Sequence, residues 1–487
     1  MSPKNEQKPT ELAPAPVTVA DSEIEVHHHH VDIVILGCGP AGQKAALSAA
    51  KHKKSVAIVE PIFIGGNCTH FGTLPSKTLR ESAMHLTNYR LKFLDSETRK
   101  TPTMANLLNR VQWVINNEVK TIEQQLRANK VNIIPGFGKF KDKNTLLIYN
   151  KKEQVEGIVH FNKAIICSGS RPFLSPDIPY DGKKIFSSDD ILTINDLPRS
   201  MTIVGGGIIG CEYACIFSIL GVKVNLIEKR TEILSLIDRE MRANLVNQLD
   251  VRKVNFFLGD EVKKVSLNGE GKVEMKLDSG KIVRSETAMI CIFRVVNSNA
   301  LNLDAIGVKV SNRGVIEVNK DYRTSCENIY AAGDVVGAPS LASTSFEQGR
   351  IAGTCASDAP CAPMSPNVPI GIYTIPEISY VGPTEVELTE KKIPYQVGKC
   401  FFKLTSRGAI MGALDGVLKI MFHQETKKVL AVHAIGDSAT ELVHVGQAVM
   451  ELGGTVDYFI DQVFNYPTMA EAYKYAALNG LNRLNDI

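Results

Sequence analysis

Two stretches of the chain share one pattern of apolar and small residues. In the first, the apolar run Val31–Leu36 leads into a glycine-rich turn, Gly37–Gly42. An alanine-rich stretch follows, and then a second apolar run, Ser55–Val59, which ends at Glu60. Short apolar runs bounded by turns predict buried strands, and the longer stretch between them predicts a helix. The predicted order is strand, glycine turn, helix, strand and acid.

The glycines of this turn are spaced as a bound dinucleotide requires. Gly37 allows a tight turn, Gly39 lets the backbone approach a pyrophosphate, and Gly42 lets the helix pack close to the strand. The helix N-terminus then faces the phosphates, and Glu60 is placed to accept a hydrogen bond from a ribose. The alternative is a glycine turn that serves packing alone.

The same pattern returns later in the chain. The run Met201–Val204 leads into a second glycine turn, and a further apolar run ends at Glu228. This turn has glycines at the matching positions: Gly205, Gly207 and Gly210. In both stretches the acid follows the first glycine by 23 positions. A shared spacing of this kind indicates two dinucleotide sites in one chain.

Three other patterns lie outside the repeats. A long helix between them carries one apolar stripe, formed by Leu108, Val111, Ile115, Val119, Ile122 and Leu126. The strand Lys163–Cys167 stops at a turn containing Gly169, which either brings backbone near a ligand or simply ends the strand. The strand starting at Ile329 ends at Asp334, whose carboxylate can bind a sugar-alcohol hydroxyl or cap a helix near Ser340.

Composition changes this picture little. Hydrophobic residues make up 44% and charged residues 22% of the 487 residues, as in ordinary globular proteins. A net charge of +3 gives no strong attraction to nucleic acid or to an anionic membrane. No run of about 18 apolar residues is present, so no membrane span is expected. The ten cysteines show no zinc spacing and predict reduced, mostly buried thiols in a cytoplasmic protein without a metal site.

The N-terminal residues do not resemble a secretion signal. Residues 1–25 are rich in Pro, Ala, Glu and Lys and lack an apolar core. We therefore expect a disordered tail over residues 1–30. His27–His30 is interpreted as a solvated tract or the remnant of a tag, and adventitious metal binding is the alternative.

The chemistry turns on the residue five positions after Cys68. A cysteine there would make a redox disulfide of the form Cys-x4-Cys at the start of a helix, but the chain has Thr73. No disulfide can form within this motif. The chain thus combines two predicted dinucleotide sites with no local dithiol to carry electrons onward.

Three longer motifs identify a family resemblance. Together with the glycine turns, they make residues 31–487 resemble the flavoprotein disulfide reductases, which include lipoamide dehydrogenase and glutathione reductase. Within this family they look most like the soluble pyridine nucleotide transhydrogenases. The motifs are Gly66–Lys77, Gly371–Ser379 and Phe464–Tyr473.

The resemblance implies an α/β fold with two Rossmann-like dinucleotide-binding domains, for FAD and for NAD(P), and a C-terminal α+β dimerisation domain. The FAD domain would span residues 31–175 and 293–363, the NAD(P) domain residues 176–292, and the dimerisation domain residues 364–487. The chain would form a homodimer or larger homo-oligomer and take NAD and NADP as small-molecule partners.

The resemblance also implies roles for individual residues. In the FAD site, Glu60 would hold the adenosine ribose and Asp334 the ribityl chain, and other residues would lie along the cofactor: Gly65, Gly66, Asn67, Cys68 and Gly169. Lys77 and Glu212 would form a catalytic ion pair near the flavin ring and the nicotinamide. The NAD(P) site would be formed by Gly205, Gly207, Gly210, Glu228, Arg230 and Arg294.

Two parts of the family's thiol apparatus are missing. Thr73 replaces the second cysteine, and Tyr466 stands where disulfide reductases place a histidine before Pro467. The expected reaction is therefore hydride exchange, NADPH + NAD+ = NADP+ + NADH, in a ping-pong cycle through reduced flavin without a redox disulfide. The alternatives are a dihydrolipoamide dehydrogenase-like enzyme, an NAD(P)H oxidase or diaphorase, and a non-catalytic redox-sensing flavoprotein.

Two positions bear on the second site. Phe293 replaces a family glycine beside the nicotinamide, where a side chain can block or reshape the site, although Arg294 and Asn297 are kept. Glu228 would accept from a ribose 2′-hydroxyl and repel a 2′-phosphate. Because alternate residues of a strand point to the same side, Arg230 should return to the side of Glu228 and offset that repulsion. We expect both dinucleotides to bind, with a preference for NAD.

Overall fold

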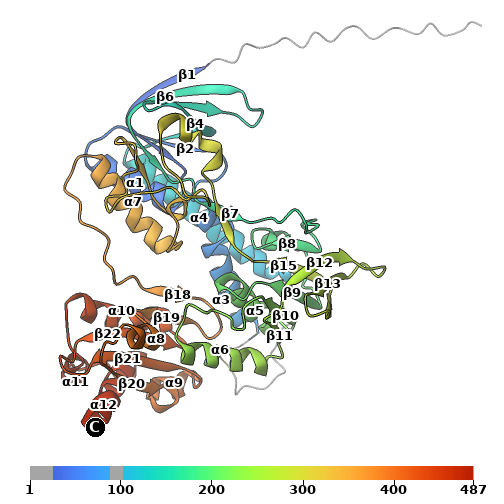
Figure 1. Cartoon of the computed structure of the whole chain (residues 1–487), viewed down its shortest axis with the longest axis vertical. Helices are drawn as coiled ribbons and strands as arrows, with labels where there is room; N and C mark the ends of the chain where they lie inside the picture. The colour runs from blue at the N-terminus through green and yellow to red at the C-terminus, as the bar shows by residue number, and fades with distance from the viewer. Residues whose placement is uncertain (1–25, 88–102, 486–487) are drawn as a thin grey trace, which may run out of the picture.

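The computed structural model describes residues 26–87 and 103–485. These residues form three large sheets, each with its own helices (Figure 1). The first sheet lies at the top of that view, the second at the right, and the C-terminal sheet at the lower left. The predicted α/β fold, with two Rossmann-like units followed by an α+β unit, is confirmed. The first sheet is partly parallel and partly antiparallel, and the second is parallel throughout. The expected tail over residues 1–25 lies outside the described residues.

The first sheet has the strand order β3-β2-β1-β6-β5-β4, with β17 beside β6. Its strands are β1 (His27–Leu36), β2 (Val56–Glu60), β3 (Asn132–Pro135), β4 (Phe137–Asp142), β5 (Thr145–Tyr149), β6 (Val155–Ile166) and β17 (Ile329–Ala331). β17 comes from far along the chain and pairs in parallel with β6. The carboxyl ends of β1, β6 and β17 therefore meet at one edge, where Asp334 follows.

Helices α1 (Pro40–Lys51) and α7 (Ala342–Ala356) pack closely against each other on this sheet. A Cβ added to Gly349 would lie 2.0 Å from the carbonyl oxygen of Ala41, and one added to Gly353 would lie 2.4 Å from that of Ala45. Backbone contact of this kind requires glycine. Three further helices follow β2 in the chain: α2 (Gly66–His70), α3 (Thr73–Leu86) and α4 (Met104–Ala128). The predicted apolar stripe of α4 is directed into the core.

The prediction that the tail extends to residue 30 is wrong. β1 begins at His27, and His27–Val31 pairs in parallel with Gly157–Phe161 of β6. The physical reason is the length of β6, whose first half extends beyond β2 and offers backbone partners to the chain before residue 31. Composition alone does not reveal a partner strand that is distant in sequence.

The second sheet is parallel, with the order β11-β10-β9-β15-β8. Its strands are β8 (Ile185–Ser187), β9 (Ser200–Val204), β10 (Lys223–Glu228), β11 (Asn255–Leu258) and β15 (Thr287–Ile290). Helices α5 (Ile208–Ile219) and α6 (Arg239–Val251) belong to it, as does a small antiparallel sheet of β12 (Val262–Leu267), β13 (Val273–Leu277) and β14 (Ile282–Ser285). A two-stranded ribbon, β7 (Ser170–Pro172) with β16 (Arg294–Val296), joins the first and second units.

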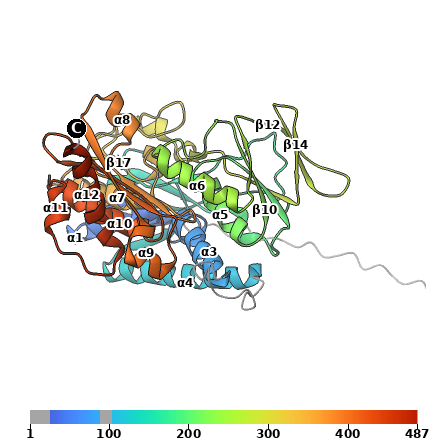
Figure 2. The same cartoon turned by 90° about the horizontal axis from the view of Figure 1, so that it is seen from below.

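The C-terminal sheet is antiparallel, with the order β18-β19-β22-β21-β20. Its strands are β18 (Ile370–Ile372), β19 (Ile378–Val381), β20 (Tyr395–Phe401), β21 (Val417–His423) and β22 (Val429–Ile435). Its helices are α8 (Glu385–Glu390), α9 (Ser406–Met411), α10 (Ala439–Glu451), α11 (Asp457–Asp461) and α12 (Ala472–Asn485). Figure 2 shows α11 and α12 on the opposite side of the molecule from β12 and β14.

Short 3-10 helices complete the described secondary structure: Asp190–Thr193, Asn299–Leu301, Leu303–Ile306, Asp334–Val336, Phe402–Leu404 and Met469–Glu471. Among the described residues, no helix is both long enough and apolar enough to cross a membrane.

A buried ammonium group joins the second unit to the C-terminal unit. Lys419 of β21 is 1% exposed, and its Nζ lies 2.9 Å from Asp238, the N-cap residue of α6. It also forms ion pairs with Glu240 and with Glu385 of α8. Burial alone would raise the pKa of Asp238, but the charge and hydrogen bond of Lys419 hold that pKa below its usual value. The network fixes α6 against the C-terminal sheet.

The prediction that all ten cysteines are reduced is wrong. Cys355, in the last turn of α7, forms a disulfide with Cys361. The other eight are free thiols, six of them buried, as expected. The disulfide was not predicted because a spacing of six residues between two cysteines does not show whether their side chains meet.

Candidate functional site

In the first glycine turn, two glycines are required by the packing of the backbone and one is not. Gly37 has φ +104°, and a Cβ there would lie 2.4 Å from the carbonyl oxygen of Cys167. A Cβ on Gly42 would lie 1.9 Å from the carbonyl oxygen of Gly37. Gly39, by contrast, has φ −72° and no atom within 4 Å of an added Cβ. The fold therefore requires Gly37 and Gly42, while Gly39 leaves space open in front of the N-terminus of α1.

The second glycine turn repeats this arrangement. Gly205 has φ +112° and lies against the carbonyl oxygen of Cys291, and Gly210 lies against the carbonyl oxygen of Gly205. Gly207 has φ −79° and again no atom within 4 Å of an added Cβ. In both turns only the middle glycine has no packing role. Space kept open at a helix N-terminus suits a pyrophosphate.

Glu60 and Glu228 each accept a hydrogen bond from the backbone of their own glycine turn. Glu60 Oε2 accepts the backbone N–H of Cys38 at 2.7 Å, and Glu228 Oε2 accepts that of Gly206 at 2.6 Å. The other oxygen of Glu228 accepts from Arg230 N and Nε, at 2.9 and 3.1 Å. Burial would raise the pKa of Glu228, but the hydrogen bonds from Arg230 and Gly206 hold it below its usual value. A carboxylate has about four acceptor positions, so both acids retain capacity for a ribose hydroxyl.

The side chains after Glu228 lie as predicted. Arg230 turns to the side of Glu228, and its Nη1 donates to Ser235 at 2.8 Å. Lys229 faces away and forms an ion pair with Glu261 at 2.7 Å. Arg230 is 62% exposed, which leaves its guanidinium accessible beside the ribose acceptor.

A second loop packs directly on the first glycine turn. Gly65 has φ +100° and donates its N–H to the carbonyl oxygen of Cys38 at 3.0 Å. A Cβ on Gly66 would lie 2.8 Å from the Cα of Gly39. Asn67 accepts the N–H of Gly72 at 2.8 Å through its backbone oxygen, which shapes the turn between α2 and α3. The structure thus brings Gly65 and Gly66 to the opening left by Gly39, and Asn67 follows them in α2.

Cys68 lies beside Thr73, not beside another sulfur. Burial raises the pKa of the Cys68 thiol, and the hydrogen bond with Thr73 and the charge of Lys77 offset only part of the rise. The thiol is therefore protonated near neutral pH, and a protonated thiol is a poor nucleophile.

Lys77 and Glu212 form the predicted ion pair. Lys77 Nζ, on α3, lies 2.7 Å from Glu212 Oε2, on α5, and the Glu212 side chain is 5% exposed. Glu212 Oε1 accepts the backbone N–H of Tyr373 at 2.8 Å, and the Lys77 ammonium lies 4.9 Å from the centre of the Tyr373 ring. The pair therefore joins all three units of the chain. Tyr373 was not predicted as a site residue, although it lies within the motif Gly371–Ser379 that carries the family resemblance.

Asp334 belongs to a chain of hydrogen bonds that sequence reasoning missed. Its Oδ2 accepts the hydroxyl of Ser170 at 2.6 Å. Arg294 donates to Ser170 Oγ at 3.0 Å and to Asp189 at 3.3 Å. The backbone oxygen of Gly169, next to Ser170, accepts the N–H of Asn297 at 2.9 Å. Arg294 thus serves to hold the ribbon of β7 and β16. No local pattern marked Ser170 or Asp189.

Phe293 and Phe173 stack on each other, with ring centroids 4.3 Å apart and planes 15° from parallel. Phe293 is 53% exposed. The segment that carries it follows β15, beside the second glycine turn, where Cys291 touches Gly205. The predicted departure from the family pattern is therefore located at the edge of the second turn.

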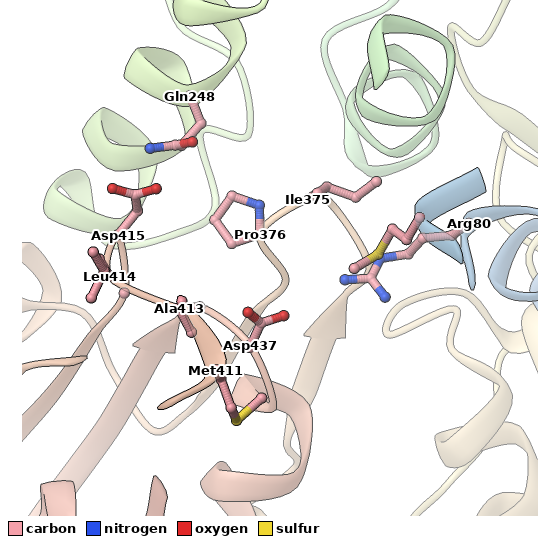
Figure 3. A pocket seen from close by; sticks show the side chains of 13 residues that line it. Arg80, Gln248, Ile375, Pro376, Met411, Ala413, Leu414, Asp415 and Asp437 are labelled. Atoms are coloured by element: carbon pink, nitrogen blue, oxygen red, sulfur yellow. The ribbon is translucent and has the colours of Figure 1, made fainter. Parts of the chain in front are cut away.

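Figure 3 shows a cavity between α3, α6 and the C-terminal unit. None of the glycines of the two turns lines it. Its lining includes Arg80, Gln248, Pro376, Met411, Asp415 and Asp437. A volume of about 20 Å³ holds a water molecule but not a dinucleotide. The candidate site is the pair of glycine turns, with open space at Gly39 and Gly207, together with Lys77 and Glu212.

Family models match both parts of the chain. Residues 31–349 match the pyridine nucleotide-disulphide oxidoreductase model, and residues 368–477 match the dimerisation domain of the same family. The chain belongs to the pyridine nucleotide-disulphide oxidoreductases. It is therefore an oxidoreductase that carries FAD and uses NAD or NADP, and the open space at Gly39 and Gly207 fits these two groups.

The chain is similar over most of its length to curated relatives. A soluble pyridine nucleotide transhydrogenase of Marinobacter nauticus is 45% identical over 459 residues, which cover 93% of this chain and 98% of the relative. A protein of the same name from Mycobacterium tuberculosis is 44% identical, over 93% and 97% of the two chains.

Solved structures show the same fold. LpdA from Mycobacterium tuberculosis superposes with a TM-score of 0.85 at 25% identity, over 93% of this chain and 99% of that one. The HOCl-induced flavoprotein disulfide reductase RclA from Escherichia coli superposes with a TM-score of 0.83 at 25% identity, over 92% and 99%.

The first prediction concerns Gly207. Gly207→Ala should keep its FAD and its fold but weaken binding of NADH and NADPH at least about tenfold, since one added methyl group in a filled space costs about 1–3 kcal/mol. Gly269→Ala is the control, because Gly269 also has open space and lies in the same domain. Titration of the two variants checks this, and equal affinities would remove Gly207 from the site.

Proposed function

We propose that the chain exchanges a hydride between the two nicotinamide dinucleotides, NADPH + NAD+ = NADP+ + NADH, in a ping-pong cycle without a redox disulfide. The observation that carries this proposal is the hydroxyl of Thr73 beside the Cys68 thiol, where a disulfide reductase needs a second sulfur. The relatives named transhydrogenase support the same reaction.

FAD, when bound, would supply a two-electron store between the two dinucleotides. The chain supplies binding and charge. The helix N-termini at Gly39 and Gly207 would hold the two pyrophosphates, and Glu60 and Glu228 would accept ribose hydroxyls. The Lys77 ammonium, held by Glu212, stabilises negative charge that develops beside it.

Tyr466 supports a reaction without thiol chemistry. Its side chain is 72% exposed, and its hydroxyl is 2.5 Å from that of Ser406. A phenol lacks the two ring nitrogens through which a histidine accepts and returns a proton, so Tyr466 does not replace the histidine of the thiol apparatus. The disulfide Cys355–Cys361 involves a buried cysteine at the end of α7, and the proposed reaction does not use it.

We further propose that the chain acts as a homodimer through residues 368–477. The C-terminal unit leaves several large apolar side chains exposed: Leu404, Ile410, Val463, Tyr466, Tyr475 and Leu478. Exposed apolar side chains on the unit that matches the family's dimerisation domain suit a contact with a second copy.

The deciding experiment is an anaerobic titration of the FAD-loaded protein. NADPH should bleach the flavin absorbance near completion with one equivalent, and NAD+ added afterwards should restore it with release of NADH. Bleaching that only oxygen or a quinone reverses would identify an oxidase or diaphorase. Absence of bleaching by either reduced dinucleotide would identify a non-catalytic flavoprotein.

Cys68→Ser tests independence from the thiol. The variant should retain exchange within about tenfold of the parent rate, because no step is assigned to sulfur. Steady-state rates with matched FAD content measure it. A loss of more than about a hundredfold, or roughly 2.7 kcal/mol of transition-state stabilisation, would contradict the thiol-free mechanism.

Arg230→Ala tests the choice between dinucleotides. NADPH should bind about tenfold more weakly, because a charged hydrogen bond to the 2′-phosphate is lost, whereas NADH should change less than about threefold. Lys229→Ala is the matched control, since Lys229 faces Glu261. Dissociation constants measured by titration decide the point. An equal loss for both dinucleotides would exclude the 2′-phosphate role, and NADPH bound more than tenfold tighter than NADH by the parent would overturn the preference for NAD.

A further inference from the structure

Three histidines from two distant segments meet on one face of the first sheet. Successive side chains of a strand alternate between faces, so His28 and His30 of β1 share one face and His27 and His29 share the other. His160 of β6 is the register partner of His30. Its ring centroid lies 4.8 Å from that of His30 and 5.8 Å from that of His28.

We propose that His28, His30 and His160 form a binding site for a divalent transition metal ion that prefers imidazole: Zn²⁺, Cu²⁺ or Ni²⁺. Each ring offers one nitrogen, and metal–nitrogen bonds are about 2.0–2.1 Å long. The rings stack with planes 14° and 18° from parallel, so binding requires them to turn. Rotation about χ2 of histidine is soft, and His28 and His30 are exposed.

Neighbouring groups define the rest of the coordination. Asp32 lies on the same face, but its carboxylate already accepts hydrogen bonds from Ser55 N and Oγ and from Asn162. Three of the roughly four acceptor positions of this carboxylate are thus used, so we assign the metal ligands to the three imidazole nitrogens. The remaining coordination positions would be taken by water.

In the described part of the chain, two groups of side chains already bring three potential ligand atoms within 4.8 Å of one another, and both are engaged. The three histidines converge to that extent only when their rings turn. Cys355 and Cys361, near Asp321, are joined as a disulfide. The carboxylates of Asp238, Glu240 and Glu385 surround the ammonium of Lys419, which supplies the positive charge there. The histidine face has no such occupant.

The site is separate from the dinucleotide sites. His28 and His30 precede residue 31, where the family match begins, so two of the three ligands lie outside the family pattern. Gly37 follows His30 by seven positions along the strand, a distance of roughly 23 Å at about 3.3 Å per residue. A metal ion there would not contact the reacting groups.

The pairing of β1 with β6 distinguishes this site from a flexible histidine tract. In a flexible tract all four consecutive histidines would contribute alike, and His160 would contribute nothing. In the strand only alternate histidines contribute, and His160 is required. The outcome thus depends on which face each side chain occupies.

The test is calorimetric titration of the FAD-loaded, full-length protein with Zn²⁺, comparing five single histidine variants. His28→Ala, His30→Ala and His160→Ala should each weaken the site at least about tenfold, since even loss of an outer partner of a metal ligand costs about 10–100-fold. His27→Ala and His29→Ala are matched controls and should change affinity less than about threefold. Retained flavin absorbance confirms that each variant is folded.

Three results would overturn the proposal. One is equal weakening by all four tract variants while His160→Ala is unchanged, which would indicate an adventitious tract. Another is the absence of any site that responds to His28→Ala. The third is a His160→Gln variant that keeps full affinity, because glutamine preserves the strand but removes the imidazole.

Discussion

Replacing Lys77 with methionine is expected to slow reduction of the bound FAD by NADPH about a hundredfold or more. Loss of one positioned charge that stabilises a transition state costs about 10²–10³ in rate. The NADPH dissociation constant should stay within about threefold, because the ammonium acts on charge that appears only as electrons arrive. Stopped-flow absorbance at increasing NADPH separates the limiting rate from saturation.

Two variants control this prediction. Lys44→Met removes an exposed lysine from α1 and should leave both quantities unchanged. Lys77→Arg keeps the positive charge and should recover part of the lost rate. If Lys77→Met keeps its limiting rate and only needs more NADPH for saturation, Lys77 is a binding residue.

The largest expected effect on stability comes from Lys419→Met. The lysine and Asp238 are 1% and 3% exposed, so the substitution leaves a buried carboxylate without its cation. Breaking a buried ion pair from one side costs about 3–5 kcal/mol. Urea unfolding followed by circular dichroism should show this loss in the transition that includes the C-terminal unit.

Lys427→Met is the matched control for that measurement. Lys427 pairs with Asp457 at 3.5 Å, and both are about 40% exposed (43% and 42%), so its loss should cost about 1 kcal/mol or less. Folding lowers the pKa of Asp238. The Asp238–Lys419 ion pair therefore stabilises the fold near neutral pH, and this contribution is lost as the pH falls through the pKa that Asp238 has in the folded protein. Equal destabilisation by the two variants would contradict the role given to Lys419.

The sequence allowed the parts of the site that depend on local geometry to be predicted. A glycine turn is specified by residues a few positions apart, and the side on which Arg230 lies follows from strand alternation. The Lys77–Glu212 pair was predicted only through the family resemblance, since α3 and α5 are brought together by tertiary packing.

The remaining parts depend on contacts between distant segments. Ser170 and Asp189 reach Arg294 because β7 pairs with β16. No residue near these positions in the sequence indicates that pairing. His27–His30 form part of a strand because β6 extends beside them in the same sheet and pairs with them. Cys355 meets Cys361 because the chain turns back after α7. Each of these contacts depends on where a segment distant in sequence lies in the fold. A single sequence does not show that position.

The two glycine turns differ in how much of the chain surrounds them. At the first turn, Gly66 lies against Gly39, and a Cβ on Gly333 would lie 3.1 Å from Ala41, so two further segments enclose it. At the second, Gly206 is approached by Ile233 and Glu228, from one neighbouring stretch. We therefore expect a guest at the first turn to dissociate more slowly than a guest at the second, because more of the chain would have to move to release it.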